Sequence, residues 1–561
     1  MPLDDYKGPR LSRRNALKAG FGVAAAAQLA LIEQTAFTPQ RAFAATKAPL
    51  SPAVPRAAAT NSLPDIQFAI GPFIAPPVTL NDGAGNVQAQ FGPIFQYFVP
   101  AKFLRTPVPN DINGMDYALN TIEDFFPFSP SGAIVHVSYG MPYFNMFPGG
   151  VNGPIVQAFM PQLLSGQNPD GTTNAFAEAV PMPTDVVGGL VGGPHAPVPN
   201  VTKDRFNVNV VIENNHMLFQ LRSDSVSNLN NILAWLKGSN NLAGNAVQSP
   251  PFRNFISFGT TRVQFVQRGL PRTMANNNNF EYATRINPDS PMWMGFLDQQ
   301  TNGAGPPEIC TFVGNSSARF TDAVPGDYLD NSSVLHLSHD IEDLFQFYAL
   351  PNQDSRHPDG EPATERIMYM FRSNTTGSAT GLPTPFNAND QFTNGGCPAF
   401  VPNAFQGRND AALNVGDADG QFVATDPASR QQNESFSGVP RIGHESSLQR
   451  SSRASDGTPI HIRVDGPGFS SLDVPAFQTF PGGTTVAAGS VQPKLEFAIF
   501  MPTAESFRQM RVNSAAQDLQ STHPKLDPGD NGLERFITAT RRQNFLVPPR
   551  DVRSFPMIEF T

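Results

Sequence analysis

The chain contains very little cysteine. Cys310 and Cys397 are the only two in 561 residues. Two thiols cannot complete the cysteine ligand sets that are typical of structural zinc sites and iron–sulfur clusters, so both kinds of centre are excluded. In an oxidising compartment the two cysteines would be able to form one disulfide, and two separate buried thiols are an equally good interpretation.

Charge is also scarce, and its sign excludes a class of partner. Charged residues make up 15% of the chain and the net charge at pH 7 is −9. Nucleic-acid binding needs a basic surface, so this balance argues against nucleic acid as a partner. No apolar run beyond the N-terminal segment approaches the roughly 18 residues of a membrane-spanning helix. We therefore expect no integral membrane segment in the mature chain.

Phenylalanine, glycine and proline are abundant. The 45 phenylalanines far outnumber the 9 tyrosines and 2 tryptophans, so phenylalanine is expected to build the core and to line any cavity. The 46 glycines and 54 prolines predict many turns and long loops. A chain of 561 residues that is 40% hydrophobic is long enough for a large core and more than one domain.

The N-terminus has the pattern of an export signal. The run LSRRNALK at 11–18 contains paired arginines, a mildly apolar stretch at 19–32 follows, and Ala42-Phe43-Ala44 offers a cleavage site. We predict a twin-arginine signal peptide at 1–44 and an Ala/Pro-rich tether at 45–62, so the protein would use the twin-arginine export machinery and be periplasmic or extracellular. This route carries folded proteins, which favours a cofactor that is loaded before export.

The order of predicted elements indicates an α+β fold. In the first half, the spacing of apolar residues predicts strands and helices in the order strand–helix–strand, strand–helix–strand, which is typical of a ferredoxin-like unit. An additional strand is predicted at 206–212. The six elements of the unit are strands at 92–99, 133–139, 217–222 and 261–267 and helices at 115–125 and 226–236.

A second cycle of elements follows. We predict a duplicated fold of two ferredoxin-like units with antiparallel sheets, helices and long loop insertions. The N-terminal domain would span 63–305 and the C-terminal domain 306–561, with a Gly/Pro/Asn-rich insertion at 352–440. Within the second domain the pattern predicts strands at 333–337 and 494–500 and helices at 340–348, 504–519 and 532–540.

Three residues have the chemistry of a haem peroxidase site. Such a site needs an imidazole as the proximal iron ligand, and a proton acceptor with a fixed cation on the opposite face. His444 and Arg463 lie 19 positions apart, and Asp298 lies in the run GFLDQ upstream. Asp465, two residues after Arg463 on an extended segment, would support the same pocket. Trp293, five residues before Asp298, is most simply a core aromatic.

Several segments, taken in order, resemble the dye-decolourising peroxidase family over most of 90–550. They include MLFQLRSD at 217–224, GFLDQ at 295–299, the strand–helix segment at 333–350, and FLVPP at 545–549. The resemblance implies one haem b per chain, held by His444 on the proximal side, with Asp298 as distal acid/base and Arg463 as distal cation. It also implies an exported peroxidase that uses hydrogen peroxide to oxidise phenolic or dye-like donors through a ferryl intermediate.

The chain departs from the family pattern, and the departures keep alternatives open. Gln299 replaces the final glycine of the G-x-x-D-G motif, and Arg463-Val464-Asp465 stands where Arg-Arg-Gly is usual. His461 is the alternative proximal ligand, because His461-Ile462-Arg463 also resembles the family's His-x-Arg. The alternative functions are a non-catalytic exported protein of the same fold with a degenerate site, and a haem protein that releases iron from the porphyrin.

Overall fold

A computed structural model describes the part of the chain in which the two sheets lie. The predicted signal, the tether and the insertion at 352–440 fall outside it, as do residues 508–519 of the helix predicted at 504–519 and residues 532–535 of the helix predicted at 532–540. The described residues are 63–76, 78–81, 86–164, 171–176, 205–206, 208, 210–286, 291–294, 307–314, 320–348, 460–479, 482–504, 506–507 and 536–561.

The first unit is ferredoxin-like, as predicted. Its strands lie in the sheet in the order β10-β3-β6-β4, and every neighbouring pair is antiparallel. Counted along the chain, this is the order fourth, first, third, second. The unit consists of β3 (Phe95–Phe103), α3 (Pro109–Phe125), β4 (Ile134–Gly140), β6 (Met217–Ser223), α6 (Val226–Leu236) and β10 (Arg262–Phe265).

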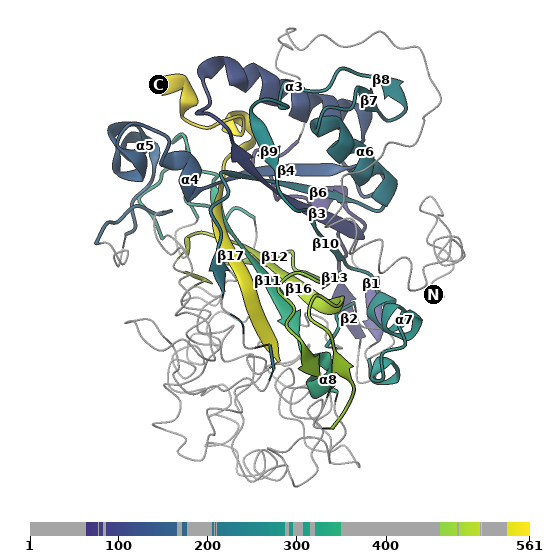
Figure 1. The fold of residues 1–561 in the computed structure, drawn as a ribbon. Coiled ribbons are helices and arrows are strands. Elements are labelled where there is room, and N and C mark those ends of the chain that lie inside the picture. The colour runs from purple at the N-terminus through teal and green to yellow at the C-terminus, as the bar shows by residue number, and fades with distance from the viewer. Residues whose placement is uncertain are drawn as a thin grey trace.

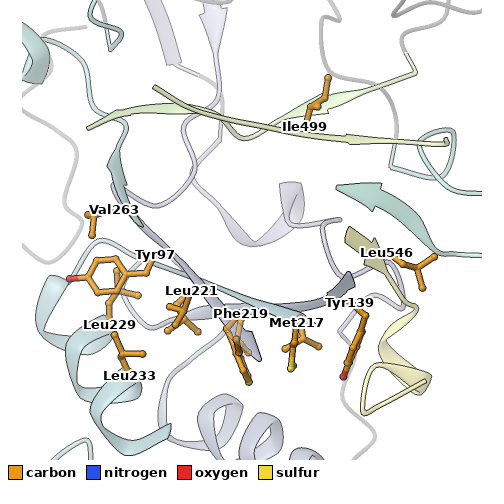
Figure 2. Packing of buried hydrophobic residues seen from close by; sticks show 14 of the residues in the cluster. Tyr97, Tyr139, Met217, Phe219, Leu221, Leu229, Leu233, Val263, Ile499 and Leu546 are labelled. Carbon is orange, nitrogen blue, oxygen red and sulfur yellow. The ribbon is translucent and has the colours of Figure 1, made fainter. Parts of the chain in front are cut away.

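Local signals explain where the two helices begin. Pro109 occupies the first turn of α3, where its missing N–H costs nothing, and Asp111 accepts a 2.8 Å hydrogen bond from the Val108 amide. Ser225 caps α6 by accepting from the Asn228 amide at 3.2 Å. Both helices cover the outer face of the first sheet, where Leu229 and other residues of α6 pack beside Phe219 (Figures 1 and 2).

The second unit repeats the strand order of the first. Its strands lie in the order β17-β11-β16-β12, and β13 continues the pairing of β12 along β16. Counted along the chain, with β12 and β13 taken as one interrupted strand, the spatial order of the strands is again fourth, first, third, second. The strands are β11 (Ser333–Glu342), β12 (Ile462–Arg463), β13 (Gly466–Ser470), β16 (Gln492–Met501) and β17 (Ile537–Val547). The predicted α+β fold with two ferredoxin-like units is therefore confirmed.

The two sheets meet along two seams. At the first seam β4 pairs with β17, where Tyr139 lies opposite Leu546. At the second seam β10 approaches β13, and the Gln264 amide donates to the Val464 carbonyl at 2.6 Å. The strands of the first unit occupy the upper part of Figure 1 and those of the second unit the lower part.

Between the sheets is a shared interior. Phe98 and Leu218 of the first sheet pack in one cluster with Leu335, Phe500 and Phe545 of the second. Side chains alternate between the two faces of a strand, so each sheet has one face in this interior and an outer face turned away from it. The outer faces carry a different set of residues from the interior.

The N-terminal segment of the described chain inserts beside the first seam. The Gln67 side chain donates to the Val137 carbonyl at 3.1 Å and to the Pro548 carbonyl at 2.7 Å, and it accepts from the Val137 amide at 3.1 Å. Phe68 stacks on Phe500 with ring centroids 4.5 Å apart. Residues 66–68 therefore hold the two units together near the ends of β4 and β17.

Shorter elements complete the described structure. Among the described residues, no helix is long and apolar enough to cross a membrane. The additional strands are β1 (Val78–Asn81), β2 (Asn86–Ala89), β5 (Val211–Ile212), β7 (Asn241–Leu242), β8 (Asn245–Ala246), β9 (Ile256–Phe258), β14 (Phe477–Gln478) and β15 (Thr485–Val486), and the additional helices are α4 (Met141–Phe144), α5 (Pro154–Phe159), α7 (Leu270–Asn277) and α8 (Leu344–Phe347).

Three predicted elements are wrong in part. The helix predicted at 340–348 is strand up to Glu342 and helix only in α8, because β11 is paired on both sides and this pairing overrides the helical spacing. The helix predicted at 532–540 is strand from Ile537 onward, where β-branched residues favour β17. The strand predicted at 206–212 is reduced to the two residues of β5, which run parallel to β17.

The second seam predicts a specific sensitivity at Gly468. A Cβ added there would lie 2.5 Å from the Val263 carbonyl oxygen and 2.8 Å from the Lys494 side chain. Gly468→Ala should therefore lower the free energy of unfolding by about 1–3 kcal/mol in chemical denaturation. Gly71→Ala, whose Cβ would meet open space, is the control. Equal stability of the two variants would contradict the close approach of β10 and β13.

Candidate functional site

The outer face of the second sheet gathers polar residues from β11, β12 and β17. Ile499 points away from the first sheet (Figure 2), and the pairing register places Arg463 of β12 and His336 of β11 beside it. His336 lies in turn opposite Asn544 of β17. Directly opposed residues in antiparallel strands share a face. Arg463, His336 and Asn544 therefore lie in one row across the outer face.

Arg463 is a cation held in a restricted environment. It is partly buried, and burial lowers the pKa of its guanidinium while the nearby Asp465 carboxylate opposes that shift. Ile462 and Val464, its chain neighbours, pack against the shared interior, so alternation turns Arg463 and Asp465 to the outer face. Burial likewise raises the pKa of Asp465, and Arg463 opposes it. The pair places a fixed positive charge beside a carboxylate on this face.

A third acidic group lies close to this pair. Glu342, at the end of β11, is 5% exposed, and burial raises the pKa of its carboxyl well above the ordinary value. The charges of Asp340 and Asp465 raise it further. Three carboxyl groups that share a poorly hydrated region cannot all ionise easily, so this arrangement favours the neutral form of Glu342. The outer face thus includes a carboxyl group of raised pKa in the neighbourhood of Asp465 and Arg463.

His336 has a structural role on the same face. Its Nδ1 is 2.7 Å from the Asn544 Oδ1 and its Nε2 is 2.6 Å from the Ser338 Oγ. The Phe507 ring stacks on the imidazole at a centroid distance of 3.3 Å, and the Arg542 guanidinium lies 5.5 Å from the centre of that ring. Both ring nitrogens are engaged and one ring face is covered, which leaves no position for a metal on His336.

Trp293, five residues before Asp298 in the sequence, is held in place through both its side chain and its backbone carbonyl. Its indole donates to the Gly468 carbonyl at 3.1 Å, and its ring lies 5.0 Å from that of Phe469. Tyr348 donates to the Trp293 carbonyl at 2.7 Å. Trp293 is fully buried, as expected for a core aromatic. Trp293 is therefore anchored to β13, the strand that follows Arg463.

The structure places some of the predicted site residues and not others. Arg463 lies on the outer face, and His461 is buried two residues before it. Asp298 and His444 lie outside the described residues, so their roles stay predictions. Cys310 is a buried thiol whose pKa is raised by burial, and Cys397, the other half of the possible disulfide, also lies outside.

Sequence reasoning missed the polar row that accompanies Arg463. Glu342, Asn544 and Arg542 were not singled out, because a helix was expected over the first and the pairing register of the others is not visible in sequence. One signal was present. The segment HLSHDIE at 336–342 alternates polar and apolar residues over its first positions, which is the pattern of a strand with two different faces.

Comparison with solved structures identified similar folds at low similarity. No protein-family model and no curated sequence matches the chain. A dye-decolorizing peroxidase in complex with 2,6-dimethoxyphenol is 15% identical with a TM-score of 0.41, covering 83% of this chain and 96% of that one. A DyP-type peroxidase from Cellulomonas bogoriensis is 13% identical with a TM-score of 0.39, covering 84% and 94%. The dye-decolorizing protein from V. cholerae is 10% identical with a TM-score of 0.36, covering 82% and 96%.

A haem and a bare metal ion make different demands on the protein. Among the described residues no group of three or more His, Cys, Asp or Glu could hold a metal. A haem needs only one imidazole from the protein, together with apolar walls and a polar group over the open iron face. Ile499, Leu546 and Phe507 supply apolar surface here and Arg463 supplies the polar group. The described residues thus offer apolar surface and a cation, and the imidazole would come from His444, which lies outside the described residues.

The protonation of Glu342 predicts a pH-dependent stability. Burial and the charges of Asp340 and Asp465 raise the pKa of its carboxyl in the folded chain well above the value of about 4.3 that it has in the unfolded chain. The unfolded state therefore binds fewer protons above that pH, and stability falls as pH rises toward the folded-state pKa. Glu342→Gln removes this dependence, so between pH 5 and 8 it should lose about 1 kcal/mol less stability than the wild type.

The measurement is urea denaturation at a series of pH values. Glu281→Gln is the matched control, because Glu281 is exposed, and it should follow the wild type at every pH. Parallel pH profiles for Glu342→Gln and the wild type would show that Glu342 ionises normally in the folded protein.

Proposed function

We propose that this protein is an exported haem peroxidase that oxidises phenolic or dye-like organic donors with hydrogen peroxide. The observation that carries the proposal is Arg463, a fixed cation on the outer face of the second sheet. It lies on β12, and the next strand, β13, accepts at Gly468 a hydrogen bond from Trp293, which lies five residues before Asp298 in the sequence. Peroxide cleavage requires a cation and an acid/base, and Asp298 would supply the acid/base beside Arg463.

Arg463 would act on charge that develops during the reaction. When the O–O bond of hydrogen peroxide breaks, negative charge accumulates on the departing oxygen, and a positioned guanidinium stabilises it. Arg is suited to this because it stays charged even where burial lowers its pKa. Asp298 would take a proton from one peroxide oxygen and return it to the other. Two electrons and two protons convert the peroxide to two waters, one electron coming from each of two donor molecules.

Haem, when bound, would supply the redox-active iron. His444 would be its proximal ligand, and the geometry of β12 favours it over His461. Alternate residues of an extended chain lie on one side about 7 Å apart, so His461 and Arg463 come to the same side of one strand. A porphyrin must separate its proximal ligand from its distal cation. A histidine from another segment, such as His444, meets this condition.

The buried carboxyl groups near Arg463 would restrict which species enter. Burial and neighbouring carboxyl groups raise the pKa of Glu342, which favours its neutral form, and the charge of Arg463 acts on the Asp465 carboxyl. A neutral hydrogen peroxide molecule can approach such a pocket without the desolvation cost that an anion would pay. The twin-arginine pattern at 11–18 supports export of the loaded protein.

Ligand assignment is tested by substitution and absorption spectroscopy. Wild-type protein made with adequate haem supply should show the intense absorption band of bound haem near its usual position in the violet. His444→Ala should lose that band, because the iron loses its protein ligand, while His461→Ala should keep it. The reverse result would transfer the proximal role to His461, and a colourless wild type would reject the proposal in favour of a non-catalytic protein of this fold.

The role of Arg463 is tested separately from haem binding. Arg463→Leu should retain the haem absorption and lower peroxide-dependent donor oxidation by about 10²–10³-fold, because the cation acts on the transition state. Arg463→Lys should recover part of the loss. Arg253→Leu removes an exposed arginine and serves as control. Full activity of Arg463→Leu at normal haem content would exclude a catalytic role. Free iron as the product, with no donor oxidised, would instead indicate iron release from the porphyrin.

A further inference from the structure

The interior face of the first sheet carries a compact polar cluster, distinct from the outer face of the second sheet. Gln96, His136, Gln220 and Arg222 come from three adjacent strands. In the pairing register Gln96 lies opposite Arg222, and His136 lies opposite Gln220. The His136 ring lies 6.3 Å from that of Phe500 of the second sheet, which places the cluster in the shared interior. We refer to these four residues as the interior polar cluster.

This cluster has more hydrogen-bonding groups than the protein satisfies. Gln96, His136 and Gln220 are each 2% exposed. Within the described part of the chain, neither the amide nitrogen nor the amide oxygen of Gln96 nor the Nε of Arg222 has a hydrogen-bond partner, and the side chains of His136 and Gln220 find no partner other than each other. An unsatisfied buried polar group costs about 1–3 kcal/mol. Several such groups side by side indicate that a polar molecule occupies the space between them.

The charge of the cluster selects the kind of molecule. Arg222 is 8% exposed, and burial lowers the pKa of its guanidinium to about 10, so it is still charged at neutral pH. Among the described residues no acidic group forms an ion pair with it. Burial lowers the pKa of His136 well below its ordinary value, and the charges of Arg222, Arg550 and Arg553 lower it further. The cluster thus combines an electropositive field with neutral donors.

The Arg222 guanidinium packs closely against the backbone at Gly92. A Cβ at this position would overlap the Arg222 Nη2, so the absence of a side chain lets the guanidinium lie against the backbone that precedes β3. Gly92 is itself partly exposed.

We propose that the interior polar cluster binds a small oxyanion, such as inorganic phosphate or a simple carboxylate. The Arg222 guanidinium neutralises the anion, and the amides of Gln96 and Gln220 donate to its oxygens. His136 stays neutral and contributes one further N–H. The site lies in the first unit, so it does not depend on the haem proposal for the second.

The experiment measures anion binding to the full-length protein by isothermal titration calorimetry, with inorganic phosphate in one series and acetate in another. Ionic strength is held constant with chloride. Wild-type protein should bind at least one of the two probes saturably at one site per chain. Arg222→Met should weaken binding by about 10- to 100-fold, the effect of losing charge-assisted hydrogen bonds. Arg253→Met, which removes an exposed arginine, should bind like the wild type.

A second variant covers the case in which Arg222→Met does not fold. Gln96→Leu leaves the charge in place and removes one donor, so it should weaken binding about 3- to 10-fold. The proposal is overturned if the wild type binds neither probe up to tens of millimolar, or if Arg222→Met or Gln96→Leu binds as tightly as the wild type. Binding of phosphate alone, or of acetate alone, assigns the site to that class of oxyanion.

Discussion

Closure of two antiparallel sheets onto each other is the constraint on which the rest of this structure depends. A four-stranded sheet that stood alone would expose unpaired backbone groups at both edges. Here the β4–β17 pairing joins one pair of edges, and the approach of β10 to β13 joins the other. Each sheet therefore acquires an interior face and an outer face. The site residues have their positions because β12 and β13 form the edge of the second sheet that lies at the second seam.

Buried charged residues contact one another across the second seam, where β10 approaches the second sheet. Arg262 of β10 pairs with Glu213 and lies 3.8 Å from Glu496 of β16, and Lys494 lies 2.5 Å from the same carboxylate. Buried ion pairs contribute little net stability, since desolvation offsets their attraction, but removing one partner is costly. We infer that the network specifies how the units join. Apolar contacts alone would tolerate several registers, whereas these charges are matched only when β10 faces β16.

The two units share a strand order and differ in what their outer faces carry. In the first unit the outer face is apolar, with Val99 and Val135 packed beneath α3 and α6. In the second unit the corresponding face bears Arg463 and His336 among apolar residues. Polar groups of the first unit lie instead in the shared interior. The duplicated fold thus supports two chemically different regions, an outer face with a cation and carboxyl groups among apolar residues, and an inner cluster of amides, an imidazole and a guanidinium.

The amino-acid pattern alone predicted the first ferredoxin-like unit, because its apolar residues follow helix and strand periods that are local properties. It also singled out Arg463, through its spacing from His444. It could not predict β17 or the full length of β11, because their strand conformation comes from partners more than a hundred residues away. Likewise the row of Arg463, His336 and Asn544, and the interior polar cluster, exist only through cross-strand register. Register depends on which edges meet, and that is decided by tertiary packing.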